Sequence, residues 1–348
     1  MNYKFICSCV RNFDKINIDV VWENLFEENH NPKPGDLMLV EVLDDTCGYD
    51  SVEDSYGRLV KLYDGDVFVA VLGNRMSGTN LVGSVPSHPL KRNDTIHLLA
   101  QGGIVGEILG VNNGHRGGKA MPLRVVGFLT DGERILNTVY EAEKKITNRN
   151  PAVHNKTIQK YFVMGTSAEV GKTTLVSRLI REIKETVPQK KIAVIKVCGT
   201  GRLKDKNQYK DAGSDFAYDF VDFGYPSTYA ISPVEYMKLF DEMLFVVEQL
   251  ADIIIVELGG DLYEANAPVA IKMSYCENCR RVLVVNDALG GIQGMQILRY
   301  DENKETTFIA TWKQNSVALQ RKLMVEPIIN TSKKEDIRLL VEELKNEK

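Results

Sequence analysis

The stretch GTSAEVGKTT, residues 165–174, constrains the fold of this chain more than any other segment. It directly follows the apolar run YFVM, and it opens a segment, residues 172–187, whose apolar spacing is that of a helix. Glycines in such a strand-to-helix turn let backbone N–H groups point at an anion, and the helix N-terminus adds the positive end of its dipole. Because Lys172 adds a full positive charge, the stretch predicts a phosphate-binding loop in an α/β domain.

The positions of this loop have distinct expected roles. The Thr173 hydroxyl is expected to bind Mg²⁺, and Lys172 is expected to contact the phosphates. Five residues separate Gly165 from Gly171, one more than in the usual pattern, so Thr166 stands where the first glycine usually lies. The residues expected to contact ATP are Gly165, Thr166, Glu169, Val170, Gly171, Lys172, Thr173 and Thr174.

The C-terminal half alternates between strand and helix patterns. Apolar residues at positions 175, 176, 179, 180 and 183 form one stripe, which is typical of a helix packed on a core. A last helix is expected near Ser332, with a capping box completed by Glu335. Short apolar runs of strand length lie at residues 191–199, 251–258, 280–287 and 306–311. This alternation predicts a mostly parallel sheet flanked by helices.

The N-terminal half has a different pattern. Between residues 36 and 128, short apolar and β-branched runs are separated by turn sequences, which predicts a β-rich barrel or sandwich. A charged helical segment at residues 133–145 and a polar stretch around Pro151 follow. A chain of 348 residues is long enough for two cores, so we expect a β-rich domain at residues 1–150 and the α/β phosphate-loop domain at residues 151–348.

Charged residues interrupt or end two of the expected strands. Glu257 lies at the end of the run at residues 251–258, where open α/β sheets bind ligands, although a solvated acid is the alternative. Lys196 interrupts the run at residues 191–199, so it needs a partner unless it reaches solvent from an edge strand. Four acids further on have helical spacing and could share one solvated face: Asp211, Asp215, Asp219 and Asp222.

The loop resembles that of dethiobiotin synthetase and its relatives, in which Gly-Thr-x-x-x-Val-Gly-Lys-Thr follows the first strand. The stretch at Glu257 is similar to their Val-Glu-Gly-x-Gly, and the resemblance covers about residues 160–330. It implies an enzyme, a synthetase or ligase or else a nucleotide hydrolase, that binds ATP and Mg²⁺. The reaction it implies is transfer of the γ-phosphoryl group to activate the carboxylate of a small molecule, by positioning and charge neutralisation.

The same resemblance implies roles for residues outside the loop. Glu257 would bind Mg²⁺, and Lys196 would act with Lys172 as a catalytic residue facing the phosphates and the substrate. One acid of the segment after residue 199 would join Thr173 and Glu257 at the metal. The candidates for that position are Asp205, Asp211 and Asp215, of which Asp211 is favoured.

Two other functions stay open. The two-domain layout is also similar to a family that includes D-glutamate N-acetyltransferases, in which a Gly-Gln-Thr-Gly stretch falls near this chain's GTGR at residues 199–202. The other is a nucleotide-driven switch or metallochaperone that acts on a protein partner, with residues 199–215 as its moving part. Its only hint of a metal is the pair Cys276 and Cys279, and a lone pair of this kind is more often structural.

Composition limits the partners and the location. The 43 Lys and Arg residues nearly balance the 47 Asp and Glu residues, and neither sign forms a long block, so nucleic acid and membranes are not expected partners. No run approaches the roughly 20 apolar residues of a membrane span, and no signal peptide is evident. We therefore expect a cytoplasmic protein with reduced cysteines, and the sequence leaves the substrate and a homo-oligomeric state open.

Overall fold

A computed structural model describes residues 3–12, 30–47, 49–78, 80–112, 118–146, 157–312, 316–325 and 327–347. The chain forms two compact units. The first comprises Met1–Asn150, Gly199–Lys204 and Phe220–Ala230, and the second comprises Pro151–Cys198, Asp205–Asp219 and Ile231–Lys348. The expected boundary at Pro151 lies outside the described residues. Two short segments after residue 198 therefore belong with the N-terminal part of the chain.

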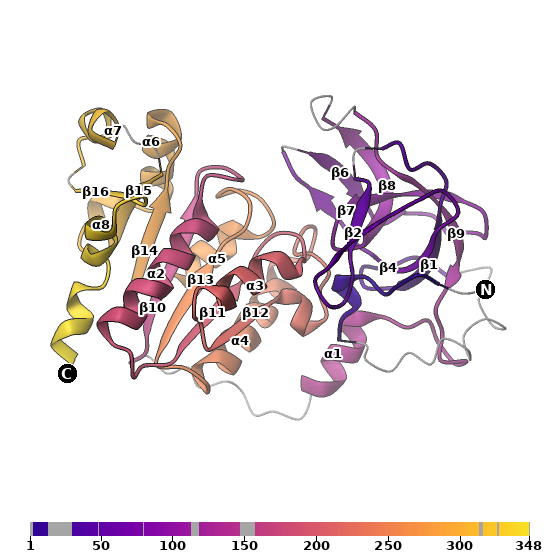
Figure 1. The fold of residues 1–348 in the computed structure, drawn as a ribbon, viewed down its shortest axis with the longest axis horizontal. Helices are drawn as coiled ribbons and strands as arrows, with labels where there is room; N and C mark the ends of the chain where they lie inside the picture. Colours follow the sequence, from indigo (N-terminus) through magenta and orange to yellow (C-terminus); the bar gives the residue numbers. More distant parts are fainter. Residues whose placement is uncertain are drawn as a thin grey trace. The chain divides into compact units, whose positions relative to one another are not determined.

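The first unit is built on a mainly antiparallel sheet with the order β4-β1-β9-β7-β8-β6-β5 (Figure 1). Strand β4 also pairs with β8, which closes the ring β4-β1-β9-β7-β8. The expected β-rich unit is thus confirmed, and the closed ring has the form of a small barrel. Its strands are β1 (Leu37–Val42), β4 (Val67–Leu72), β5 (Arg75–Met76), β6 (Leu81–Ser84), β7 (Thr95–Ala100), β8 (Ile104–Val111) and β9 (Pro122–Phe128), with a separate hairpin of β2 (Ser51–Glu53) and β3 (Leu59–Lys61) and a helix α1 (Thr138–Ile146).

The second unit contains a seven-stranded sheet in which every pairing is parallel. Its order is β12-β11-β13-β10-β14-β15-β16, so the chain extends to one side of β10 and then to the other. Ligands of open α/β sheets bind where the order reverses in this way, beyond the carboxyl ends of the strands. The strands are β10 (Gln159–Gly165), β11 (Ile192–Lys196), β12 (Phe216–Asp219), β13 (Ile253–Glu257), β14 (Cys279–Val284), β15 (Thr307–Thr311) and β16 (Ile328–Asn330).

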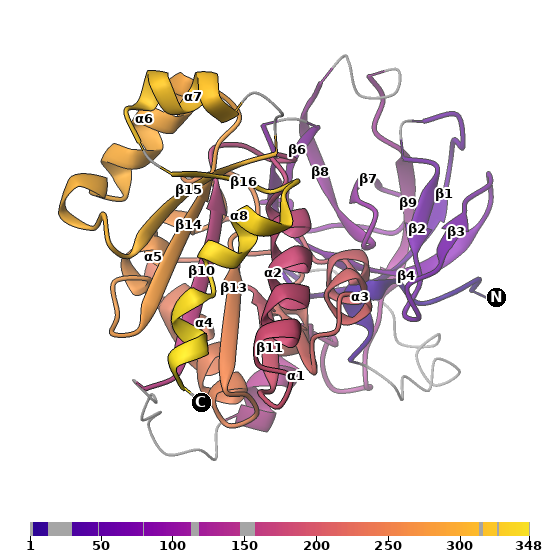
Figure 2. The same ribbon diagram turned by 60° about the vertical axis from the view of Figure 1, so that its left-hand side comes forward.

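Helices cover both faces of this sheet, which confirms the predicted α/β architecture (Figure 2). On one face the whole predicted stripe of α2 is buried against Val163, Val194 and Ile255. On the other face Phe162 stacks with Phe240 of α4. The helices are α2 (Lys172–Thr186), α3 (Leu203–Asp211), α4 (Pro233–Glu248), α5 (Ala267–Met273), α6 (Ala288–Ile297), α7 (Ser316–Leu323) and α8 (Lys334–Leu339). None of the described helices is long and apolar enough to cross a membrane.

Two local expectations are wrong. The acids between residues 211 and 222 do not share a helical face, because α3 ends at Asp211 and the chain continues as strand β12 after the turn at Gly213. The last helix has Lys333 at its N-cap without a side-chain cap. Ser332 was expected to cap this helix. Its hydroxyl instead donates a hydrogen bond to the carbonyl oxygen of Trp312 at 3.4 Å.

Candidate functional site

The loop between β10 and α2 has the backbone that a phosphate loop requires. Gly171 is the N-cap of α2 with a φ of 101°, and no side chain caps the helix there, so its first N–H groups face outward from the helix end. Glu169 also has a positive φ, of 59°. A Cβ atom on Gly165 would lie 2.4 Å from Val170 Cγ1, so only glycine fits under the buried Val170. These residues shape the loop, while Thr174 is exposed on the first turn of α2.

Lys172 points back across this loop. Its Nζ donates to the carbonyl oxygens of Ser167, at 2.9 Å, and of Gly260, at 2.6 Å, and the side chain is buried. Burial lowers the pKa of Lys172 to about 8, with Lys196 acting in the same sense and Glu257 opposing both. A buried ammonium with carbonyl partners gains from an anion placed beside it.

Glu257 ends β13 directly beside the loop. Its Oε1 accepts a hydrogen bond from the Thr173 hydroxyl at 2.8 Å, and its Oε2 accepts one from the Tyr209 hydroxyl at 2.8 Å. The residue is 2 % exposed. Burial raises the pKa of the Glu257 carboxyl and Asp205 adds to this, while Lys196 and Tyr209 act in the opposite sense. The structure therefore brings together two of the three residues expected to bind Mg²⁺, Thr173 and Glu257.

Lys196 lies in a row of charges at the carboxyl ends of three neighbouring strands. Its register partners are Glu257 on β13 and Asp219 on β12, so the three side chains leave the same face of the parallel sheet. The ammonium of Lys196 forms an ion pair and hydrogen bond with Asp205 of α3. Burial acts to lower the pKa of Lys196, but Asp205 and Glu257 outweigh it, so the pKa is raised. Lys196 thus stays charged inside the cluster.

The favoured third metal ligand, Asp211, does not lie in this cluster. It is exposed at the last position of α3, two residues beyond Tyr209, which places it about 200° around the helix from the face that meets Glu257. Asp205 is four residues before Tyr209 and therefore shares that face. Asp215 is also elsewhere, since its carboxylate pairs with Lys184 at 2.6 Å and accepts from the backbone of Ile192. Of the three candidates, Asp205 is the one at the site.

Three members of the cluster were not expected at this site from the sequence. Tyr209 holds one oxygen of Glu257, the carbonyl of Gly260 holds Lys172, and Asp219 completes the row beside Lys196. The spacing of Asp205 and Tyr209 on one helix was a usable signal for the first. Asp219 could not be found that way, because β12 was interpreted as part of a helix.

The cluster suits a cation that takes most of its coordinating oxygens from phosphates and water and few from the protein. In the part of the chain that the structure describes, no three His, Cys, Asp or Glu side chains are grouped so that they alone could hold a metal ion. Mg²⁺ commonly uses only one or two carboxylates and takes its other oxygens from phosphates and water. One buried carboxylate in contact with a threonine hydroxyl, beside an anion loop, fits that ligand set.

Two other sequence candidates have different surroundings. The GTGR stretch is packed inside the first unit, where a Cβ atom on Gly201 would lie 2.2 Å from Val221 Cγ2, so this glycine serves close packing. The expectation of reduced cysteines is wrong for one pair, because Cys276 and Cys279 form a disulfide. The other four cysteines form no disulfide: Cys7, Cys9, Cys47 and Cys198.

No family model matches the chain, and no curated protein matches it. Among solved structures, the signal recognition particle receptor FtsY of Elizabethkingia anophelis is similar over 59% of this chain and 71% of that chain, with 17% identity and a TM-score of 0.33. A ParA family ATPase of Chlorobium tepidum is similar over 54% of this chain and 93% of that chain, with 10% identity and a TM-score of 0.32. FlhF in complex with GMPPNP and Mg²⁺ is similar over 55% of this chain and 76% of that chain, with 14% identity and a TM-score of 0.31. These scores are too low to establish a common fold, so the chemistry of the site rests on the residues of the loop and of the adjoining strand ends.

Proposed function

We propose that the second unit binds a nucleoside triphosphate with Mg²⁺ on the loop at residues 165–174 and cleaves or transfers its γ-phosphoryl group. The observation that carries this proposal is the 2.8 Å hydrogen bond between Thr173 and Glu257, at the mouth of a loop that already holds a buried lysine. The hydroxyl and the carboxylate, in contact at the start of α2, can provide two oxygens to a hard cation. The N–H groups at the N-terminus of α2 can donate hydrogen bonds to the phosphates of the nucleotide.

Each residue of the cluster then has a task. Lys172 exchanges the carbonyls of Ser167 and Gly260 for phosphate oxygens, which are better partners for a buried ammonium. Tyr209 keeps the Glu257 carboxylate oriented, because burial and the charge of Glu257 raise its own pKa well above the usual range and leave it a donor. A bound Mg²⁺ would supply charge neutralisation at the phosphates. The protein contributes position and electrostatics, which provide most of the catalysis in phosphoryl transfer.

The acceptor in this proposal is the carboxylate of a small molecule, and the nucleotide is ATP. Both follow from the resemblance of the loop and of the Glu257 stretch to the dethiobiotin synthetase group. Lys196 supports an anionic acceptor, because its ammonium is kept charged by Asp205 and lies in register with Glu257. A carboxylate that took the place of Asp205 at this strand end would pair with the Lys196 ammonium next to the phosphates.

A nucleotide-driven switch is the second candidate, and the course of the chain favours it. Residues 199–204 belong to the first unit, and Asp205, which pairs with Lys196, follows them directly. A nucleotide that displaced Asp205 would therefore change the conformation of the chain next to residues 199–204. Turnover that requires a particular small acid would favour phosphoryl transfer, whereas slow hydrolysis stimulated by a protein would favour the switch.

The test of the leading proposal is the Mg²⁺ dependence of ATP turnover in Glu257→Gln. This change removes one negative charge at nearly constant volume, so the Mg²⁺ concentration for half-maximal turnover should rise at least about tenfold. The matched control is Tyr209→Phe, which keeps the carboxylate and removes only one of its hydrogen bonds, and its shift should be smaller. Superimposable Mg²⁺ curves for wild type and Glu257→Gln would remove Glu257 from the metal site.

A further inference from the structure

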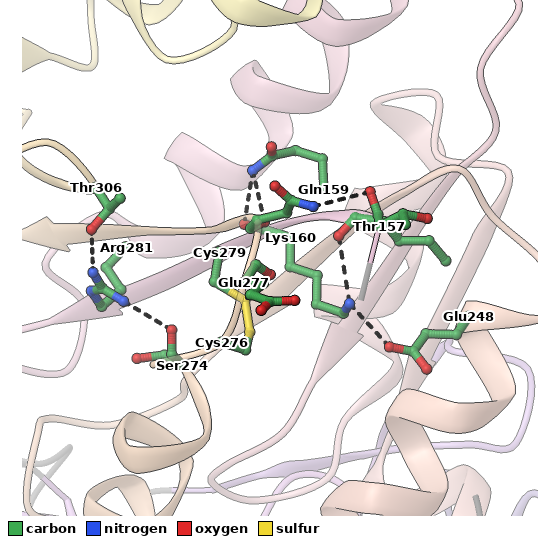
Figure 3. The surroundings of a disulfide bond; sticks show 12 residues. Thr157, Gln159, Lys160, Glu248, Ser274, Cys276, Glu277, Cys279, Arg281 and Thr306 are labelled. Carbon is green, nitrogen blue, oxygen red and sulfur yellow. Dashed lines mark hydrogen bonds and ion pairs between the residues drawn. A yellow bond between two sulfur atoms is a disulfide. The ribbon is translucent and has the colours of Figure 1, made fainter. Parts of the chain in front are cut away.

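The Cys276–Cys279 disulfide joins the loop after α5 to the first residue of β14 (Figure 3). Its Cα atoms are 5.5 Å apart, within the ordinary range for a disulfide. The two cysteines differ in access, since Cys276 is exposed whereas Cys279 is 3 % exposed. An external thiolate must approach a sulfur directly to exchange with it, so only one end of this bond is open to attack.

Two cations share the sheet face of Cys279. Lys160 is its register partner on the neighbouring parallel strand β10, and Arg281 lies two residues further along β14. Figure 3 shows the disulfide between these side chains, with Arg281 on one side and Lys160 on the other. The charge of Lys160 is neutralised by Glu248, whose carboxylate lies 3.0 Å away in a fully buried ion pair.

In the part of the chain that the structure describes, the hydrogen-bond partners of Arg281 are neutral. Its guanidinium donates to the carbonyl oxygen of Ser274 at 2.9 Å and to the Thr307 hydroxyl at 3.1 Å, and further to Asn303 and Thr306. Within the described residues, no carboxylate is hydrogen-bonded or ion-paired with it, although the residue is only 3 % exposed. Burial lowers the pKa of Arg281. A buried guanidinium without a counter-ion is costly, so a negative charge formed beside it is favoured.

We propose that Cys276 and Cys279 form a reversible thiol-exchange site whose co-reactants are low-molecular-weight thiols and disulfides. A thiolate attacks Sγ of Cys276, the Cys276–Cys279 bond breaks, and its electron pair leaves on Sγ of Cys279. A second thiolate attacks the sulfur of the small molecule in the mixed disulfide, which releases a small-molecule disulfide and the Cys276 thiolate. Two small thiols are oxidised and one protein disulfide is reduced, and water supplies the protons that the two cysteines take up.

The surroundings accommodate the reduced state. Arg281 carries a positive charge on the same face of β14, two residues beyond Cys279, and a cation on that face favours the thiolate that leaves on Cys279. When the thiolate takes up a proton, the carbonyl oxygen of Glu277, 3.4 Å from Cys279 Sγ, can accept its hydrogen bond. Both protonation states of the reduced Cys279 are therefore accommodated. This inference does not depend on the proposed nucleotide site.

The first test uses the full chain in buffers of reduced and oxidised glutathione, with acid quenching and alkylation to count thiols by mass. Cys276 and Cys279 should gain thiol together as the glutathione ratio rises. In Cys279→Ser, Cys276 should trap one glutathione as a mixed disulfide, whereas in Cys276→Ser the buried Cys279 should not. Cys47 is the internal comparison, because it is half-buried and its pKa is raised to about 11, mainly by burial. A disulfide that glutathione cannot open in the folded protein, or glutathione attached equally to Cys47 and Cys276, would overturn the proposal.

The second test separates Arg281 from its neighbour. At a pH where the Cys279 thiolate predominates, Arg281→Gln should lower the ratio of dithiol to disulfide about tenfold at a fixed glutathione ratio, which corresponds to about one pKa unit at the leaving thiol. Arg280→Gln is the matched control, because Arg280 points to the opposite face of β14 and pairs with Glu343. An equal effect of both changes, or none from Arg281→Gln, would overturn the role of Arg281.

Discussion

Raising the pH from 7 to 9 should weaken nucleotide binding through Lys172. Burial lowers the pKa of this residue from 10.5 to about 8, so protonating it costs about 3 kcal/mol more in the folded protein than in the unfolded chain. Since the folded pKa is the lower one, the unfolded chain binds more protons between pH 8 and pH 10.5. The contribution of Lys172 to stability therefore rises with pH across that window.

Phosphate reverses the effect of burial on Lys172, because an anion beside the ammonium favours its protonated form. Binding at pH 8 should therefore take up about half a proton, and the dissociation constant should be roughly tenfold larger at pH 9 than at pH 7. Titration calorimetry in buffers of different ionisation enthalpy measures both quantities. The phosphates of the nucleotide are already ionised over most of this range.

The control for this prediction is Lys172→Arg, since arginine does not lose its proton below pH 12. Any binding that this variant retains should vary less with pH between 7 and 9 than binding by the wild type. The reasoning is refuted if wild-type affinity is the same at pH 7 and pH 9, or if Lys172→Arg has the same pH dependence as the wild type.

Two further predictions concern the cluster and the division of the chain. Asp205→Asn should lower the free energy of unfolding by about 1–3 kcal/mol in urea, because it removes the carboxylate that is ion-paired with Lys196, while Asp211→Asn should change it by less than about 0.5 kcal/mol. Equal effects would contradict the assignment of Asp205 to the site. Limited proteolysis should cut first within residues 148–158, where the sequence is polar and contains Pro151, and fragments with no cut in this stretch would count against the boundary there.

The sequence predicted the architecture of the second unit well, because its signals are local. The apolar stripe of α2 and the buried runs of β10, β11, β13, β14 and β15 each follow from short-range spacing. Strand β12 was missed, since its residues FAYD mix apolar and acidic side chains and helical spacing fitted them equally well. The closing of the first unit by β4 and β8 depends on long-range pairing, which composition does not encode.

The sequence predicted those site residues whose position follows from a local motif. It did not predict those whose position depends on tertiary contacts. Lys172, Thr173 and Glu257 follow from the loop and from the end of a buried strand. The choice of Asp205 over Asp211 depends on which face of α3 meets the sheet, and α3 is too polar for its sequence to show a packed face. The disulfide depends on the distance between two cysteines in the folded chain, which their spacing alone does not settle.

The central claim is that this loop binds nucleotide phosphates, and calorimetric titration of ATP with Mg²⁺ into wild type and Lys172→Ala tests it most directly. The account predicts saturable binding by the wild type and a loss of about 10- to 100-fold in affinity in the variant, which lacks a charged hydrogen-bond donor. The melting temperature without nucleotide should not fall, because the change removes a buried charge whose hydrogen-bond partners among the described residues are two carbonyl groups. Equal affinity in the two proteins, or no binding by the wild type, would contradict the claim.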